Sequence, residues 1–324
     1  MDKTPILSVI IPHYNSPELL RKAITSACVN SNVQVIVVDD KSDLSKELLV
    51  SLEGFCKDKN AFFYRNSTDK KGAGVCRNIG LEHATGDWLL LLDADDYFVD
   101  GWYEVVSPFF DSTADMIYFP PLAIRLETGE KDGRSQMYFD MVTEYLRNHS
   151  EKNELQLRYR FVNSASKMVR LQIIRENNIR FDEVICSNDV MFMTQCAYYS
   201  KQVDACKSPI YVATRSKGTL TSKKTEAKFL IALDVFIRRY QFLKERLEDN
   251  KFKAVHLSWV AMAKLIDAFI SGLGMKCVID TYKKFKLNNI RFIDCAMFFP
   301  LNIYKNLKIE FLWHIGIAKV KHKR

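Results

Sequence analysis

Short apolar runs alternate with helix-like segments along the first hundred residues. The runs show no strict alternation of apolar and polar positions, which is typical of strands buried on both faces. The candidate strands are residues 7–12, 33–40, 61–66 and 87–92. The candidate helices between them are residues 16–28, 44–56 and 73–86. This order predicts an α/β fold in which helices flank a mostly parallel sheet.

The first candidate helix has clear start signals and an apolar face. Ser16 is expected to cap it, with Pro17 at the first helical position. Its apolar side chains recur at helical spacing and are Leu20, Ala23, Ile24 and Ala27. The third candidate helix is expected to end at Gly86.

The rest of the chain follows a different pattern. Residues 101–222 are less regular, with a strand-like stretch at 114–124 and a helix-like stretch at 190–200. From about residue 223 onward the pattern is helical and basic. The predicted organisation has three parts, residues 1–100, residues 101–222, and a helical basic region at 223–324.

Composition indicates a soluble cytoplasmic protein. The chain has 324 residues, of which 48% are hydrophobic and 27% charged. Its beginning lacks the basic start and long apolar core of a signal peptide. The most apolar C-terminal stretch, residues 254–279, is interrupted by Lys264, Asp267 and Lys276, so we expect no membrane-spanning helix. The eight cysteines lack metal-binding or disulfide spacing and are expected to be reduced.

Charge divides the chain into two parts. Residues 215–324 contain 23 Lys and Arg against 9 Asp and Glu, whereas the first 214 residues contain 24 against 30. The net charges are therefore +14 and −6. Such a division predicts different partners for the two parts.

Polar side chains gather where the candidate strands end. They are Asn15 after the first strand, Asp39 and Asp40 after the second, Asn66 after the third, and Asp93 and Asp95 after the fourth. Any one of them could simply cap a helix or complete a turn. Because ligands of parallel sheets bind beyond the carboxyl ends of the strands, their agreement predicts a binding site at this edge.

Common nucleotide-binding motifs do not account for the polar residues at this edge of the sheet. The stretch GAGVCRNIG has Arg77 where a dinucleotide fingerprint needs its third glycine, and it follows the third candidate strand rather than the first. A sugar nucleotidyltransferase would have a glycine-rich phosphate loop after its first strand, but the sequence there is PHYNSPELL. The sequence contains no P-loop.

Three segments resemble the nucleotide-sugar half of the family 2 glycosyltransferases in order and spacing. They are SVIIPHYN, VIVVDDKSD and KKGAGVCRNIGLEHATGDWLLLLDADD, with the D-x-D motif at Asp93 and Asp95. A looser match continues through SKMVRLQIIRENNIRFDEVICSNDVMF, and residues after about 223 show no comparable match. The resemblance implies the glycosyltransferase A fold, with a nucleotide-sugar-binding half at residues 1–100 and an acceptor-binding half at 101–222. It also implies inverting transfer from a UDP-sugar and a divalent cation, Mn²⁺ or Mg²⁺. A cation stabilises the diphosphate leaving group, and few protein carboxylates suffice because the phosphates supply further ligands.

The resemblance also implies roles for individual residues. Asp95 is the expected metal ligand, Asp93 reaches the metal or the ribose, and Asp96 is a turn or capping residue. Asp40 matches the aspartate that hydrogen-bonds uracil. With Asn66 from the third strand end, the expected nucleotide-sugar-binding set is Pro12, Tyr14, Asn15, Asp39, Asp40, Asn66, Arg77, Asn78, Asp93, Arg215 and Lys217. Arg77 could instead be an ordinary surface charge, and Arg215 and Lys217 could belong to a solvated basic loop.

The catalytic base is expected at Asp189. In the family it is the aspartate of a Glu-Asp pair before a helix, and the pair here is Asn188-Asp189. Losing the neighbouring negative charge tends to make Asp189 less basic. Alternatively, Asp189 only caps the helix that starts at Val190. Asp182 and Glu183 are the fallback candidates.

Residues 301–324 mix aromatic and aliphatic side chains with basic ones. Such a mixture suits a helix lying on an anionic membrane, although an ordinary helix with a solvated tail is the alternative. No nucleic-acid-binding motif accompanies the charge. We therefore expect a cytoplasmic enzyme, peripheral on the inner face of the plasma membrane, that extends a lipid-linked glycan for bacterial capsule, O-antigen or lipopolysaccharide. The alternatives are a sugar nucleotidyltransferase and a non-catalytic relative that binds sugar nucleotides.

Overall fold

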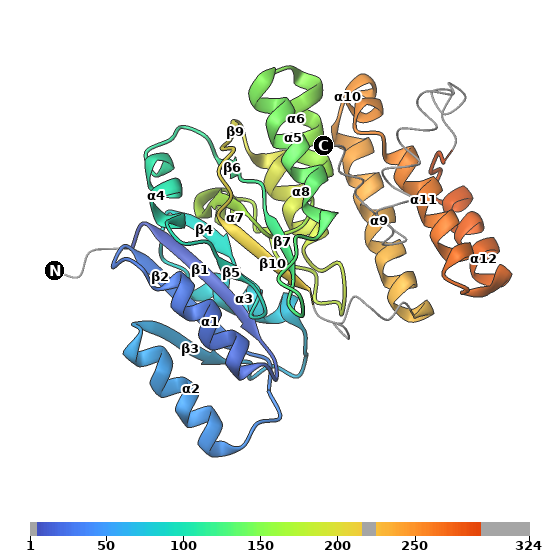
Figure 1. The fold of residues 1–324 in the computed structure, drawn as a ribbon. Coiled ribbons are helices and arrows are strands. Elements are labelled where there is room, and N and C mark those ends of the chain that lie inside the picture. Colours follow the sequence, from blue (N-terminus) through green and yellow to red (C-terminus); the bar gives the residue numbers. More distant parts are fainter. Residues whose placement is uncertain (1–4, 216–224, 293–324) are drawn as a thin grey trace. The chain divides into compact units, whose positions relative to one another are not determined.

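The computed structural model describes residues 5–215 and 225–292 (Figure 1). The chain divides into two compact units, Met1–Ser216 and Lys217–Arg324. We call them the sheet unit and the helical unit and describe each by itself.

The sheet unit contains a seven-stranded sheet of order β3-β2-β1-β4-β8-β6-β9 and a three-stranded sheet of order β5-β10-β7. In the larger sheet β8 runs antiparallel to both of its neighbours, and the other pairs are parallel. The strands are β1 (Leu7–His13), β2 (Val33–Asp39), β3 (Ala61–Arg65), β4 (Trp88–Leu91), β5 (Tyr97–Phe98), β6 (Met116–Tyr118), β7 (Leu122–Arg125), β8 (Lys167–Arg170), β9 (Val203–Ala205) and β10 (Tyr211–Arg215). The predicted mostly parallel sheet is confirmed. The sheet contains strands from both sides of the predicted boundary at residue 100, because β4 pairs with β8.

Helices cover both faces of this sheet. They are α1 (Pro17–Ala27), α2 (Lys46–Asp58), α3 (Ala73–His83), α4 (Trp102–Val106), α5 (Gln136–Arg147), α6 (Glu151–Arg160), α7 (Leu171–Glu176) and α8 (Val190–Tyr199), with short 3₁₀ turns at Ser107–Phe109 and Gly133–Ser135. Val9 and Ile11 of β1 join one core cluster with the predicted apolar face of α1. Ile10 points to the opposite face, where α3 packs so closely that a Cβ on Gly80 would lie 2.5 Å from Ile10 Cγ2.

The predicted start of α1 is confirmed, with Ser16 at the N-cap position and Pro17 first in the helix, whereas the expected capping bond and the end of α3 need correction. The side chain of Ser16 makes no capping hydrogen bond with α1; its backbone N–H donates to His13 Nε2 at 3.2 Å instead. Helix α3 ends at His83 rather than at Gly86. Gly86 is needed for a different reason, because a Cβ there would lie 2.8 Å from the backbone nitrogen of Ser8 in β1.

The chain order creates a ligand crevice beside β1. From β1 the chain builds outward through β2 and β3, and then returns to place β4 on the other side of β1. Parallel sheets bind ligands at such a reversal, beyond the carboxyl ends of the strands. The predicted polar strand ends therefore belong to one edge of one sheet.

The helical unit consists, in its described part, of α9 (Glu226–Arg246), α10 (Asp249–Ala254), α11 (Leu257–Ile270) and α12 (Gly274–Leu287). Helix α9 buries Phe236, Tyr240 and Leu243, and α12 packs with Phe285, whose ring lies 6.0 Å from that of Phe236. Within the described ranges, no helix combines the length and apolar character needed to cross a bilayer.

Candidate active site

Three aspartates lie together in the turn between β4 and β5. One carboxylate oxygen from each of Asp93, Asp95 and Asp96 lies within 4.8 Å of the others. Asp96 is buried and accepts hydrogen bonds from the Tyr211 hydroxyl at 2.5 Å and the Thr214 backbone N–H at 2.6 Å. Asp96 therefore fastens β10 to this turn, whereas Asp93 and Asp95 are only partly buried.

The turn that carries Asp93, Asp95 and Asp96, which we call the aspartate turn, favours the binding of a cation. Burial and the neighbouring charge of Asp93 raise the pKa of Asp95 to about 6. Burial and the charges of Asp93 and Asp95 raise the pKa of Asp96 well above its ordinary value. A positive ion relieves such repulsion because it stabilises the ionised carboxylates. Carboxylate oxygens are the ligands that Mg²⁺ and Mn²⁺ prefer, so Asp93 and Asp95 fit such an ion.

Arg77 of α3 connects the aspartate turn to the segment before α8. Its Nη2 donates a hydrogen bond to Asp93 Oδ1 at 2.5 Å, and its Nη1 donates to Asn188 Oδ1 at 2.6 Å. The side chain is buried, so the alternative that Arg77 is an ordinary surface charge is wrong. Burial opposes its charge, but Asp93 and Asp189 outweigh this and raise the pKa of the guanidinium. Its Nε is buried without a hydrogen-bond partner among the described residues, which leaves one donor for a ligand.

Asp189 lies immediately before α8, but its side chain does not cap that helix. Its Oδ2 instead accepts a hydrogen bond from the Ser164 backbone N–H at 2.8 Å. The alternative in which Asp189 only caps α8 does not agree with this geometry. Because the adjacent Asn188 is bound to Arg77, the expected base is linked to the aspartate turn through a single guanidinium.

A close contact between α3 and residues 181–188 positions this link. Gly74 is required there, because a Cβ would lie 2.1 Å from the carbonyl oxygen of Asp182. One turn later, the Asn78 amide accepts from the Phe181 N–H at 2.8 Å and donates to the Phe181 carbonyl at 3.0 Å. Asn78 thus holds the segment that leads to Asp189. Glu183, a fallback base, is paired with Lys70 at 2.5 Å.

Lys167 of β8 is a buried amine that interacts with the charge of the expected base, Asp189. Its Nζ donates to the carbonyl and side-chain oxygens of Asn163, and it lies 3.7 Å from the centre of the Phe161 ring. Burial lowers the pKa of Lys167 well below its ordinary value, and the charge of Asp189 opposes this shift. Lys167 thereby fixes Asn163. The next residue in the chain, Ser164, donates its backbone N–H to Asp189.

The ends of β2 and β3 form a second hydrogen-bonded group. Asp40 accepts from the Asn66 side-chain amide at 2.8 Å and from the Gly72 N–H at 2.7 Å. Asp39 is fully buried, with its oxygens bound by His13 Nδ1 at 2.9 Å and the Ser42 N–H at 3.1 Å. Burial opposes the charge of Asp39, but these hydrogen bonds outweigh it and lower the pKa. Asp39 therefore fixes the loops after β1 and β2 rather than facing outward.

The first loop exposes one aromatic ring. Pro12 is buried in β1 opposite Val38. Tyr14 is 50% exposed, and Lys71 Nζ lies 5.3 Å from its ring centre. Asn15 adopts a left-handed conformation, φ 52°, and its side chain accepts from the Asp43 N–H at 2.7 Å. Tyr14 is thus the member of this loop that is free to stack against a ligand.

The expected basic contacts near residue 215 are only partly described. Arg215 ends β10, and its Nη1 lies 3.3 Å from Asp132 Oδ2. Lys217 and residues 301–324 lie outside the described residues.

Several contributors have no signal in the sequence. Tyr211, Ser164 and His13 act through residues distant in the chain. Lys167 is fully buried at the start of the strand KMVR, but a second charge, Arg170, ends the same strand, so the sequence does not distinguish it.

The sequence matches the model of glycosyl transferase family 2 over residues 8–176. An uncharacterized glycosyltransferase of Haemophilus influenzae is 37% identical over 100 residues, which cover 30% of this chain and 38% of that protein. The poly(ribitol-phosphate) beta-N-acetylglucosaminyltransferase TarS of Staphylococcus aureus is 26% identical over 217 residues, covering 65% of this chain and 36% of TarS. The chain thus spans little more than a third of either relative.

Solved structures share the fold. TarS residues 1–349 in complex with UDP-GlcNAc align with a TM-score of 0.65 at 18% identity, covering 95% of this chain and 89% of that chain. The mannosyltransferase PcManGT from Pyrobaculum calidifontis, in complex with GDP-Man and Mn²⁺, aligns with a TM-score of 0.56 at 13% identity, covering 97% and 87%. At these identities the likeness shows the fold alone. It confirms the predicted glycosyltransferase A architecture.

Proposed function

The chain belongs to glycosyl transferase family 2, and we propose that it transfers a hexosyl or N-acetylhexosaminyl group from a UDP-sugar to a hydroxyl group of a glycan or glycolipid. The observation that carries this proposal is the Arg77 bridge, which binds Asp93 on one side and Asn188, the neighbour of Asp189, on the other. The bridge places the candidate diphosphate site and the candidate base on either side of one buried guanidinium group.

Each residue has a chemical role in this proposal. Asp189 accepts the proton of the acceptor hydroxyl as its oxygen attacks the anomeric carbon. A single displacement of this kind inverts the anomeric configuration. Asp95, with Asp93, would hold Mn²⁺ or Mg²⁺, which supplies Lewis-acid stabilisation of the leaving diphosphate. Arg77 adds a fixed positive charge, and its unpartnered Nε is available to a phosphate oxygen.

The nucleotide end of the site is proposed on the β2 and β3 ends. Asp40 would hydrogen-bond uracil, with Asn66 fixing its carboxylate and Tyr14 covering the base or ribose. Asp39 and Asn78 would act indirectly, because Asp39 is fully buried against His13 and Ser42 and the Asn78 amide is bound on both its atoms to Phe181. Arg215 and Lys217 remain proposed diphosphate contacts.

The biological setting is proposed from the relatives. TarS acts on poly(ribitol phosphate), and its structure contains UDP-GlcNAc. We place this chain in the synthesis of a bacterial surface polysaccharide, at the inner face of the plasma membrane, with a lipid-linked acceptor.

Release of UDP tests the proposal. The full chain is incubated with Mn²⁺ and a panel of nucleotide sugars, and Mn²⁺ binding is followed separately by electron paramagnetic resonance. We expect slow UDP release from one UDP-sugar, lost together with Mn²⁺ binding in Asp95→Ala. Pyrophosphate production from UTP and a sugar phosphate would instead indicate a nucleotidyltransferase. UDP binding without release from any donor or with any glycan acceptor would indicate a non-catalytic relative.

A further inference from the structure

Helix α12 has two unlike faces. Cys277, Thr281 and Phe285 are buried and recur at a spacing of four residues, so they form the packed side. On the other side lie Met275 and Ile279, which are 59% and 46% exposed. A helix that packs on only one side usually carries polar residues on the other, so large exposed apolar side chains there are unusual.

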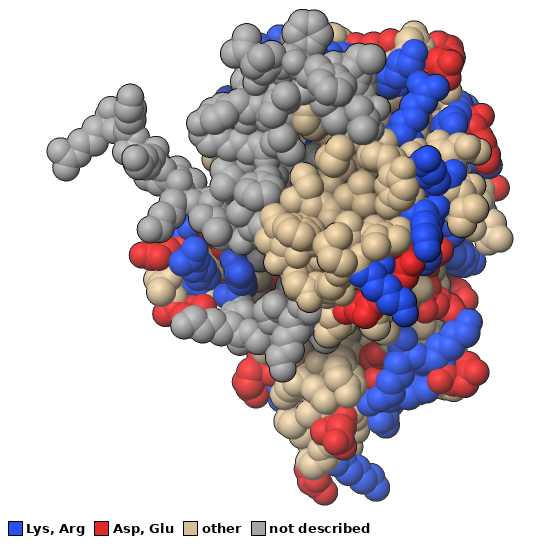
Figure 2. All heavy atoms as spheres, turned by 90° about the vertical axis from the view of Figure 1, so that its right-hand side faces the viewer, with Lys and Arg blue, Asp and Glu red and all other residues tan. Residues whose placement is uncertain are grey.

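The apolar surface continues onto α11. Phe269 and Ile270, at the end of α11, are 66% and 46% exposed. The turn from residue 271 to 273 brings them to the start of α12, next to Met275. Figure 2 shows a broad uncharged area on the face that it draws, with Lys and Arg side chains, and some Asp and Glu among them, along one margin. We call the set Phe269, Ile270, Met275, Ile279 and Tyr282 the apolar face.

Basic residues border the apolar face. Between residues 268 and 292 the sequence contains five Lys and Arg and a single acidic residue, Asp280. Lys276, Lys283 and Lys286 are exposed on α12, and Lys286 Nζ lies 5.5 Å from the ring centre of Tyr282. No ion pair joins these three lysines to an acidic group within the described part of the helical unit. Their charges are therefore available to an external anion.

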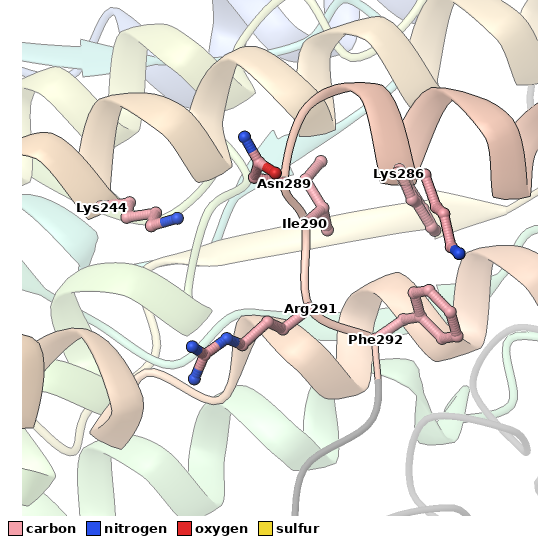
Figure 3. Close-up of a pocket in the computed structure, with 7 residues that line it drawn as sticks. Lys244, Lys286, Asn289, Ile290, Arg291 and Phe292 are labelled. Atoms are coloured by element: carbon pink, nitrogen blue, oxygen red, sulfur yellow. The ribbon is translucent and has the colours of Figure 1, made fainter.

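A hollow at the end of α12 adds further cations. It has a volume of about 580 Å³ and is lined by Lys244 of α9, Lys286 of α12, Asn289 and Arg291, with Phe285, Ile290 and Phe292. In Figure 3, Lys244 and Arg291 extend on one side, and Lys286 lies beside Phe292 on the other. Cations around an amide and aromatic rings suit a phosphate group attached to an apolar body.

We propose that the apolar face of α11 and α12 docks on an anionic membrane, with acyl chains against Phe269 and Ile279 and lipid phosphates against the bordering lysines and the hollow. Charge complementarity selects this partner. With five Lys and Arg against one acidic residue between residues 268 and 292, a symmetric contact between two copies would bring two surfaces of positive net charge together, and like charges repel. The docking extends the proposed function, whose acceptor is lipid-linked, but it is measured without donor or acceptor. Failure of docking therefore leaves the transferase proposal intact.

Vesicle flotation of the full chain tests this inference. The probes are vesicles of phosphatidylcholine alone and vesicles that also contain phosphatidylglycerol. We expect binding to the anionic vesicles, weakened roughly tenfold or more in Phe269→Ser/Ile279→Ser and by a similar factor in Lys276→Gln/Lys283→Gln/Lys286→Gln. Raising the salt concentration should weaken binding of the unaltered chain and have less effect on the lysine variant. Helix α2 supplies matched controls, Val50→Ser and Lys46→Gln/Lys57→Gln, at exposed positions of the sheet unit.

Three results would overturn the inference. One is binding that changes neither in Phe269→Ser/Ile279→Ser nor in the lysine variant, and another is an equal loss in the α2 controls. The third is a change from dimer to monomer in Phe269→Ser/Ile279→Ser with vesicle binding retained, which would assign the face to a second copy. Hydrogen exchange provides an independent check: residues 265–287 of the unaltered chain should become protected when anionic vesicles are added, and unchanged exchange there contradicts docking.

Discussion

Charged side chains have different environments in the sheet unit and in the helical unit. At the mouth of the sheet, buried charged side chains have specific partners, as Arg77 has in Asp93 and Asn188 and Asp39 has in His13. On α12 the lysines remain exposed beside exposed apolar side chains. A buried charge needs preorganised partners, whereas exposed cations attract an anionic surface without fixed geometry. The first arrangement suits one small ligand in one orientation, and the second suits an extended partner.

The largest expected effect concerns Asp189. Asp189→Asn keeps the shape of the side chain but removes the group that accepts the acceptor proton. We expect turnover to fall by about 10²–10⁴-fold, with the affinity for UDP unchanged because the aspartate turn is intact. Turnover with acceptor and UDP binding by calorimetry are the measurements.

Asp182→Asn is the matched control for this change. Asp182 is close to Asp189 in sequence and was an alternative base, and its backbone N–H donates to the Asn188 carbonyl at 3.1 Å. It should retain most of the activity. A loss confined to Asp182→Asn would move the base to that residue.

Breaking the Arg77 bridge should have the next largest effect. Arg77→Lys keeps the charge but cannot bind Asp93 and Asn188 together, because an ammonium group lacks the fork of a guanidinium. We expect the affinity for UDP to fall about tenfold and the free energy of unfolding to fall by about 2 kcal/mol. Arg175→Lys is the control, since the Arg175 guanidinium donates to a single backbone group among the described residues, the Ala84 carbonyl at 2.6 Å. Equal losses in both variants would mean that the Arg77 bridge is merely structural.

Sequence patterns predicted the sheet better than the site. The four strands, their parallel order and the face of α1 follow from local apolar patterns, and the structure confirms them. The predicted end of α3 was wrong because Gly86 is required by a close contact with β1, which is far away in sequence. A local rule about glycine as a helix stop cannot detect such a contact.

The site shows the same limit at the level of single residues. The sequence showed that the strands end in polar residues, but it did not show which partners each of these residues binds. Asp39 and Asp40 are neighbours in sequence, yet Asp39 is fixed by His13 while Asp40 binds Asn66 and Gly72. The choice depends on which loop folds over which carboxylate. For the same reason Arg77 could not be distinguished from a surface charge until α3 was seen to pack against residues 181–188.

A smaller effect should appear in stability rather than activity. The pKa of Asp95 is about 6 in the folded chain against an ordinary value of 3.8. The folded state therefore binds more protons than the unfolded state between these values, and stability falls as pH rises through this window. Asp95→Asn removes this penalty and should stabilise the metal-free protein by about 1–3 kcal/mol at pH 7.5.

Urea denaturation without divalent ions measures this effect. The gain should shrink at pH 5, where Asp95 in the unaltered chain is largely protonated. Asp93→Asn is the counterpart, and it should not stabilise the protein, because it removes a partner of Arg77. A loss of stability in Asp95→Asn at pH 7.5 would mean that the carboxylate is held by protein groups rather than kept for a cation.

The smallest expected effect concerns the apolar face itself. Phe269 is 66% exposed, whereas Phe285 of the neighbouring helix is 0% exposed. In the absence of vesicles, Phe269→Ser should change the free energy of unfolding by less than about 0.5 kcal/mol, whereas Phe285→Ala should cost about 3–5 kcal/mol because it leaves a cavity. If Phe269→Ser instead costs more than about 2 kcal/mol, the ring is buried in solution. Either another part of this chain or a second copy then covers the face, and an external membrane is no longer needed to explain it.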